Sequence, residues 1–97
     1  MLHCINLSPF CGESFTTCLR FAQDQDPILL IQDGVYAAQT GTKFASLVES
    51  ALAKNPVFAL ESDLLARGIT TTLEGVQVID YDGFVGLAEK HQVNSWL

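Results

Sequence analysis

Four consecutive apolar residues, Ile28, Leu29, Leu30 and Ile31, follow Pro27 and end at a polar segment, residues 32–34. A strand with one face in water alternates apolar and polar residues, whereas an uninterrupted apolar run of this length is typical of a strand covered on both faces. Strands of that kind belong to parallel sheets with helices packed on each side. We therefore expect an α/β fold in which this run is an inner strand.

Strand-like and helix-like segments alternate along the chain. Short apolar runs predict three further strands, at residues 2–7, 57–61 and 76–80. Apolar residues at helical spacing predict helices at 15–23, 35–39, 44–54, 63–68 and 82–91. This alternation predicts a small three-layer, flavodoxin- or Rossmann-like domain over residues 1–97, with a mainly parallel four-stranded sheet. The last residues, Ser95, Trp96 and Leu97, are interpreted as a tail.

Residues at the segment ends predict how the helices begin and end. Ser14 and Ser62 are suited to cap the first turns of their helices, and Gly68 is suited to the left-handed position after a helix. Acidic residues follow three of the four predicted strands, and those such as Asp80 and Asp82 are expected to cap the next helix. Ligands of open α/β sheets bind beyond the carboxyl ends of the strands, so those ends are where chemistry is expected.

Charge and missing motifs exclude several functions. The net charge is −6, with eleven acidic against five basic residues, so direct binding to nucleic acid is not expected. The first strand is followed by neither a GxGxxG nor a Walker motif, and Cys and His lack metal-binding spacing, so no cofactor and no metal are expected. A membrane-length apolar run and a basic leader are also missing, which predicts a cytoplasmic protein.

The composition predicts a protein partner. Hydrophobic residues make up 48% of the chain and charged residues only 16%, which is apolar for so short a sequence. The mean hydropathy is +0.27. A small domain buries a limited share of its surface, so part of this apolar surface is expected to meet another chain.

The three cysteines leave two interpretations open, packing or sulfur chemistry. Cys4 lies within the first predicted strand and is expected in the core. Cys11 lies in the following loop and is expected to be exposed, but Glu13 beside it does not favour a thiolate. Cys18 lies on the apolar face of the first helix, where composition alone favours packing. His3 is expected to be a hydrogen-bonded structural histidine.

Several stretches taken together resemble the TusB/DsrH family along nearly the whole chain: "LHCINLSPF", "LLIQDGVYAA", "FALESDLLARG", "VIDYDGFVGLAEKH" and the terminal "WL". The resemblance implies a DsrE-like fold and a subunit of a sulfur-relay complex. In such complexes this type of chain joins TusC/DsrF-type and TusD/DsrE-type subunits in a dimer of heterotrimers. The D/E-type subunit carries the essential persulfide cysteine and passes sulfur to a TusE/DsrC-type acceptor.

The resemblance also bears on Cys18. Its context "TCLRFA" matches the "SCLKFA"-like context of Dsr-type H chains, so Cys18 is a candidate persulfide carrier. The leading expectation is an accessory subunit of a relay toward 2-thiolation of the tRNA wobble uridine. The alternatives are a DsrEFH-type subunit in sulfur oxidation with Cys18 as sulfur-binding thiol, a stand-alone sulfurtransferase using Cys18 or Cys11, and a flavodoxin-like binding module.

Overall fold

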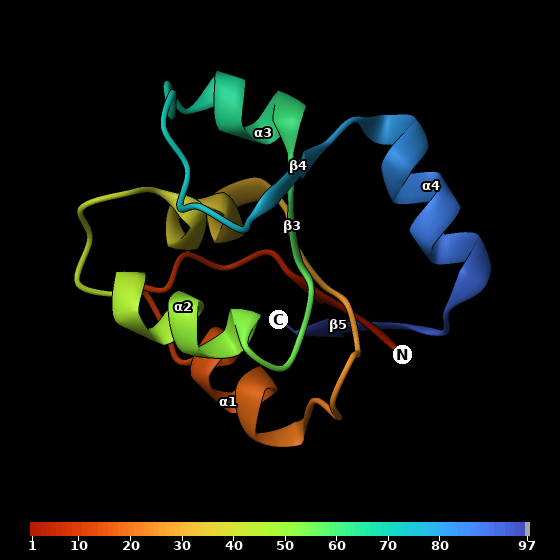
Figure 1. Ribbon diagram of the computed structural model, residues 1–97. Helices are drawn as coiled ribbons and strands as arrows, with labels where there is room; N and C mark the ends of the chain where they lie inside the picture. Colours follow the sequence, from red (N-terminus) through yellow and green to blue (C-terminus); the bar gives the residue numbers. More distant parts are fainter. Residues whose placement is uncertain (97) are drawn as a thin grey trace.

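The computed structural model describes residues 1–96, which form a five-stranded parallel sheet with helices on both faces (Figure 1). The strands are β1 (Leu2–Ile5), β2 (Ile28–Leu30), β3 (Val57–Leu60), β4 (Gln77–Ile79) and β5 (Val93–Trp96). The helices are α1 (Ser14–Phe21), the 3-10 helix η1 (Gln32–Ala38), α2 (Ala45–Leu52), α3 (Glu61–Ala66) and α4 (Tyr81–Lys90). No helix within this part of the chain has the length and apolarity needed to cross a bilayer.

The sheet confirms the predicted fold class and adds one strand. Its order is β4-β3-β2-β1-β5, and every neighbouring pair is parallel. The four predicted strands are all present, but Ser95 and Trp96, interpreted as part of a tail, belong to the edge strand β5, in which Val93 pairs with Leu2 and Trp96 with Ile5. Leu97 of that tail lies outside the described residues. The short strand β5 contains Asn94 and Ser95 and therefore has no apolar run. Its pairing with β1 is what makes it a strand.

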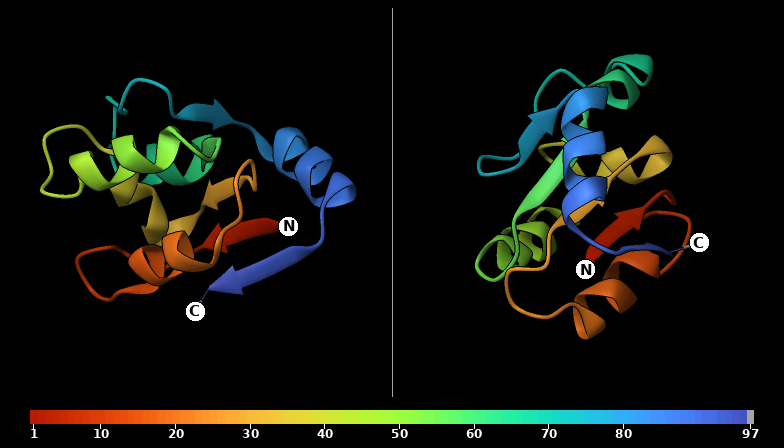
Figure 2. Two further views of the ribbon diagram at one scale, coloured as in Figure 1. Left: turned by 60° about the horizontal axis from the view of Figure 1, so that its bottom comes forward. Right: turned by 90° about the vertical axis from the view of Figure 1, so that its right-hand side faces the viewer.

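The direction of the crossovers decides which face each helix covers. The chain steps from β1 to β2, β3 and β4 in one direction, so right-handed crossovers place α1, α2 and α3 on the same face. The last connection runs back across the sheet to β5, and α4 therefore lies on the opposite face (Figures 1 and 2). The result is the predicted arrangement of three layers.

Each face of the sheet has its own apolar core. On the face of α1, α2 and α3, the helix residues Cys18, Val48 and Leu64 pack with sheet residues including Ile5 and Leu30. On the other face Leu2, Cys4 and Leu29 form a smaller cluster, against which Phe84 and Leu87 of α4 pack. Leu29 and Leu30 point to opposite faces and both are fully buried, which confirms that the run at 28–31 is covered on both sides.

The prediction that Ser14 and Ser62 cap their helices is wrong, whereas the predictions for Gly68 and Asp80 at helix ends are confirmed. The N-cap positions of α1 and α3 are Glu13 and Leu60, because each helix begins one residue or more earlier than expected; α3 follows β3 with no intervening loop. Gly68 adopts the expected left-handed conformation, with φ of 68°. Asp80 caps α4, its Oδ1 accepting the backbone N–H of Gly83 at 2.8 Å.

The segment predicted as a short helix at 35–39 is the longer 3-10 helix η1, which passes close to β1. A side chain at Gly34 would collide with the backbone carbonyl of Ile5, so only glycine allows η1 to approach the strand this closely. The backbone N–H of Gly34 donates to the carbonyl of Ile31 at 2.9 Å. Close packing of η1 on the sheet thus depends on one residue without a side chain.

Candidate functional site

The acidic residues at the carboxyl ends of β2 and β3 are held in an ion-pair network. Arg67 donates from Nε to Asp33 Oδ1 at 2.8 Å, and its Nη1 lies 3.6 Å from Asp63 Oδ1. Asp63 Oδ2 accepts the backbone N–H of Gln32 at 2.7 Å, where Gln32 has a positive φ of 50°. These ion pairs join η1 to α3 at the carboxyl ends of β2 and β3, while the side chain of Asp33 remains 59% exposed.

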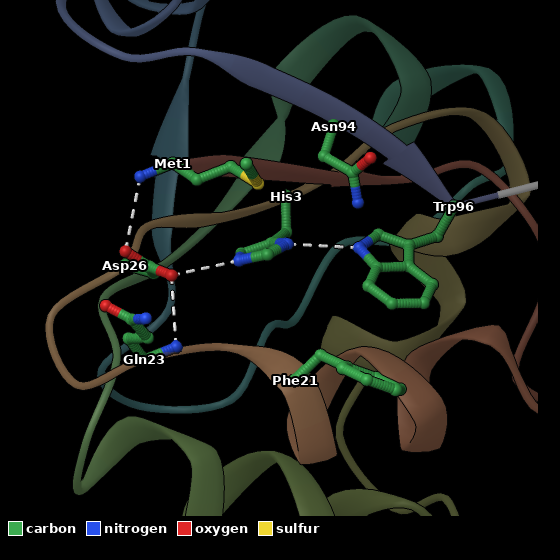
Figure 3. A pocket seen from close by; sticks show the side chains of 7 residues that line it. All are labelled: Met1, His3, Phe21, Gln23, Asp26, Asn94 and Trp96. Carbon is green, nitrogen blue, oxygen red and sulfur yellow. Dashed lines mark hydrogen bonds and ion pairs between the residues drawn. The ribbon is translucent and has the colours of Figure 1, made fainter.

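A pocket of about 500 Å³ opens elsewhere, between the end of α1 and the sheet edge formed by β1 and β5 (Figure 3). Its lining residues are Met1, His3, Phe21, Gln23, Asp26, Asn94 and Trp96. In Figure 3, Asn94, His3 and Trp96 form one wall, and Phe21 and Gln23 lie across from it. His3 and Asn94 are register partners on β1 and β5, so the pairing of these strands builds that wall.

A chain of hydrogen bonds runs through the base of this pocket. The indole Nε1–H of Trp96 donates to His3 Nδ1 at 3.0 Å, and His3 Nε2 lies 3.1 Å from Asp26 Oδ2. Because Nδ1 accepts, the neutral ring carries its proton on Nε2 and donates it to Asp26. Both ring nitrogens of this buried histidine are thus satisfied, which agrees with its predicted structural role.

Asp26 is an ionised carboxylate at the rim of the pocket. Partial burial opposes ionisation, but hydrogen bonds from His3, from the backbone N–H of Gln23 and from the N-terminal ammonium of Met1 outweigh it and lower the pKa of Asp26. The Gln23 N–H lies 3.0 Å from Oδ2, and the ammonium lies 3.2 Å from Oδ1. The side chain of Asp26 remains 18% exposed, so the charge is still accessible from the pocket.

The loop that carries Asp26 is held by Asn55, which follows α2. The buried side chain of Asn55 donates from Nδ2 to the carbonyls of Gln23 at 2.8 Å and Asp26 at 2.9 Å. Gln25 adopts a left-handed conformation between them, and its N–H donates to the carbonyl of Lys54 at 2.8 Å. Asn55 thereby fixes the position from which Asp26 reaches His3.

The three cysteines are free thiols in different surroundings. Cys4 and Cys18 are buried, and Cys11 is exposed, as predicted for Cys4 and Cys11. Burial in the core, and then the negative charge of Asp26, raise the pKa of Cys18 to about 12. In this conformation the Cys18 thiol therefore stays protonated near neutral pH, a state that opposes nucleophilic chemistry.

The predicted and observed sites differ in position. Of the candidate residues, only His3 lines the pocket, and none of the residues at the strand ends where chemistry was expected does so. The sequence patterns assign no role to Asp26 and place Trp96 only in a tail. Within residues 1–96, no group of three or more His, Cys, Asp or Glu side chains is placed to hold a metal ion.

Comparisons with known proteins agree with the fold and with the sequence patterns. Among solved structures, the ychN protein from E. coli matches with a TM-score of 0.81 at 19% identity, covering 97% of both chains. Protein Tm0979 from Thermotoga maritima matches with a TM-score of 0.62 at 26% identity, covering 95% of both. These two likenesses support the fold.

Sequence comparisons identify the family. The chain is 40% identical over 92 residues to Protein TusB of Escherichia coli K12, with 94% of each chain covered, and 41% identical over the same length to Protein TusB of Shigella flexneri. Residues 7–94 match the family described as DsrH like protein. The chain with the DsrE-like fold described above therefore belongs to the DsrH family.

Proposed function

We propose that this chain is an accessory subunit of a cytoplasmic sulfur-relay complex of the TusBCD type, which passes persulfide sulfur toward 2-thiolation of the tRNA wobble uridine. The observation that carries the proposal is the relationship to Protein TusB across 94% of both chains. The partners are TusC/DsrF-type and TusD/DsrE-type subunits in a dimer of heterotrimers, with a TusE/DsrC-type protein as the sulfur acceptor. The chain itself uses no cofactor and does not bind the tRNA.

The accessory role is supported by the state of the thiols. A sulfur carrier needs an accessible thiolate, whereas the thiol of Cys18 is buried and its pKa is raised to about 12. Cys11 is exposed, but the family motif assigns it no role. The chain therefore contributes to assembly, and a partner subunit carries the sulfur.

Exposed apolar side chains support assembly with other subunits. Phe21, Leu65 and Tyr81 are each about two-thirds exposed, and Phe10 about half. Together with the apolar composition of so short a chain, these exposed side chains favour contact with partner chains. The acidic net charge fits a subunit that takes part in a tRNA pathway without touching RNA.

Replacement of the E. coli relative tests the proposal. An E. coli strain that lacks its Protein TusB is supplied with this chain, and the 2-thiouridine content of its tRNA is measured. We expect thiolation to return, and native mass spectrometry of the purified chain to show two further small subunits. A chain that is fully active in sulfur transfer as an isolated monomer would contradict the proposal.

The second candidate function makes Cys18 the sulfur-binding thiol of a DsrEFH-type subunit, on the basis of its "TCLRFA" context. This role remains a prediction, and it requires the thiol to become exposed upon assembly. Mass spectrometry of the intact complex after incubation with a persulfide donor distinguishes the two candidates. Added sulfur on Cys18 favours the second, whereas added sulfur on a partner alone, unchanged by Cys18→Ala, favours the accessory role.

A further inference from the structure

The pocket beside β5 offers two aromatic rings to an incoming group. Phe21 at the end of α1 is 68% exposed, and the indole of Trp96 is partly exposed. Their ring centroids lie 5.9 Å apart and their planes are inclined by 33° (Figure 3). The electron-rich faces of aromatic rings attract cations, and the attraction is stronger where the contact is shielded from water.

The same pocket supplies a negative charge at its rim. Asp26 is held ionised, because its hydrogen bonds and the nearby ammonium lower its pKa. Within the described residues, Oδ2 accepts from His3 and Gln23, whereas Oδ1 accepts only from the ammonium of Met1. A carboxylate oxygen can accept more than one hydrogen bond, so Oδ1 retains acceptor capacity beside the ammonium 3.2 Å away, which offsets part of the charge of Asp26.

Asn94 adds a side-chain amide to the lining of the pocket. Its side chain lies on the wall between His3 and Trp96 in Figure 3 and is partly buried. Among residues 1–96, no hydrogen bond to its side-chain amide is found, so its oxygen is free to accept one from a ligand. The pocket thus presents aromatic faces, a carboxylate and an amide oxygen together.

We propose that this pocket receives an arginine side chain from a partner protein. A guanidinium group is planar and weakly hydrated, stacks on aromatic rings and carries several N–H donors, so it can use all three features at once. The ammonium group of lysine is a strongly hydrated point charge and is less suited to stacking on the aromatic rings. The net charge of −6 also favours approach of a basic partner surface. This proposal stands apart from the relay function and from any role of Cys18.

The single tryptophan of the chain makes the proposal directly measurable. The full chain is titrated with acetyl-Gly-Arg-Gly-amide, while Trp96 fluorescence and its indole N–H signal in NMR are recorded. The matched controls are the same peptide with lysine and with citrulline, which has nearly the shape of arginine but no charge, at constant ionic strength. We expect saturable binding of the arginine peptide that is about tenfold or more tighter than that of the citrulline peptide.

Variants then test each part of the pocket. Phe21→Leu keeps apolar bulk but removes the aromatic face, and it is expected to weaken arginine binding about two- to fivefold. Asp26→Asn is expected to weaken it about tenfold or more. Because Asp26 also supports the fold, Phe21→Leu at an exposed ring is the decisive variant. Tyr81→Leu, equally exposed at 68% but outside the pocket, is expected to change nothing.

The outcomes that overturn the proposal are separate from failure of the relay function. They are no saturable binding of the arginine peptide, equal binding of the citrulline or lysine peptide, or binding unchanged by Phe21→Leu. Each of these results is obtained on the isolated chain and does not depend on tRNA thiolation.

Discussion

The indole N–H of Trp96 donates a hydrogen bond to Nδ1 of His3 at 3.0 Å, although 93 positions separate the two residues. This bond joins the side chain of Trp96 on the edge strand β5 to that of His3 on β1. It also determines which nitrogen of His3 carries the proton, and through it the hydrogen bond to Asp26. One contact between the first and last strands therefore organises the base of the pocket.

Trp96→Phe tests this contact. Phenylalanine keeps an aromatic ring but has no donor, so the buried Nδ1 of His3 loses its partner, and we expect the free energy of unfolding to fall by about 1–3 kcal/mol. Urea unfolding followed by circular dichroism measures the change. Tyr81→Phe on the exposed surface is the control and is expected to stay within about 0.5 kcal/mol. Equal effects of the two variants would contradict the role assigned to Trp96.

Asn55→Asp tests the loop that carries Asp26. The change replaces the donor of two hydrogen bonds with a carboxylate that faces the carbonyls of Gln23 and Asp26, and we expect a loss of about 3 kcal/mol or more. Gln92→Glu makes the same chemical change at an exposed position and is expected to be nearly neutral. Chemical denaturation of both variants gives the two free energies of unfolding. A loss of stability for Asn55→Asp as small as that for Gln92→Glu would contradict the role of Asn55 in holding this loop.

Thiol reactivity tests the burial of the cysteines. A thiol reagent such as dithionitrobenzoate is expected to modify one thiol rapidly in the native chain, that of Cys11, and all three in denaturant. Cys11→Ser should abolish the rapid phase. Rapid native modification of Cys18, at a rate comparable to that of Cys11, would show that its thiol is accessible and would favour the role of Cys18 as sulfur carrier.

Stability at alkaline pH follows from the raised pKa of Cys18. The pKa of Cys18 is about 12 in the folded chain and about 8.5 for a free thiol. The contribution of the protonated thiol to folding stability is therefore fully present below about pH 8.5, and it is lost as the pH rises toward about 12. The slope approaches about 1.4 kcal/mol per pH unit within this range. We expect the stability of the wild type to fall more steeply than that of Cys18→Ala between pH 8.5 and 10. Parallel curves would contradict the stated cause.

Two glycines provide opposite expectations. Gly34→Ala places a side chain against the carbonyl of Ile5, so η1 must move away from β1, and we expect a loss of about 3 kcal/mol or more. Gly86→Ala meets open space within α4 and is expected to stabilise the chain by about 0.5–1 kcal/mol. Thermal unfolding of both variants decides the matter. A gain in stability for Gly34→Ala would contradict the close approach of η1.

Local patterns predict most of the fold. The apolar run at 28–31 indicates an inner strand because both faces are covered, and the order of strand and helix segments restricts the chain to a parallel three-layer sheet. Sequence patterns also place Cys4 in the core, Cys11 at the surface and Asp80 at a helix start. These features depend on residues close to one another in the chain, which is why the sequence is enough to predict them.

The fifth strand and the pocket depend on contacts between distant parts of the chain. Trp96 lies in a short polar segment that becomes a strand because it pairs with β1. Asp26 lies in a turn, and its place in the pocket depends on hydrogen bonds with Asn55 and His3. The burial of Cys18 similarly results from how α1 packs on the sheet. Periodicity is a local property, so the order of the elements and their layers can be predicted from the amino-acid sequence. Which polar groups meet depends on how the chain packs, because hydrogen-bond partners far apart in sequence leave no periodic pattern.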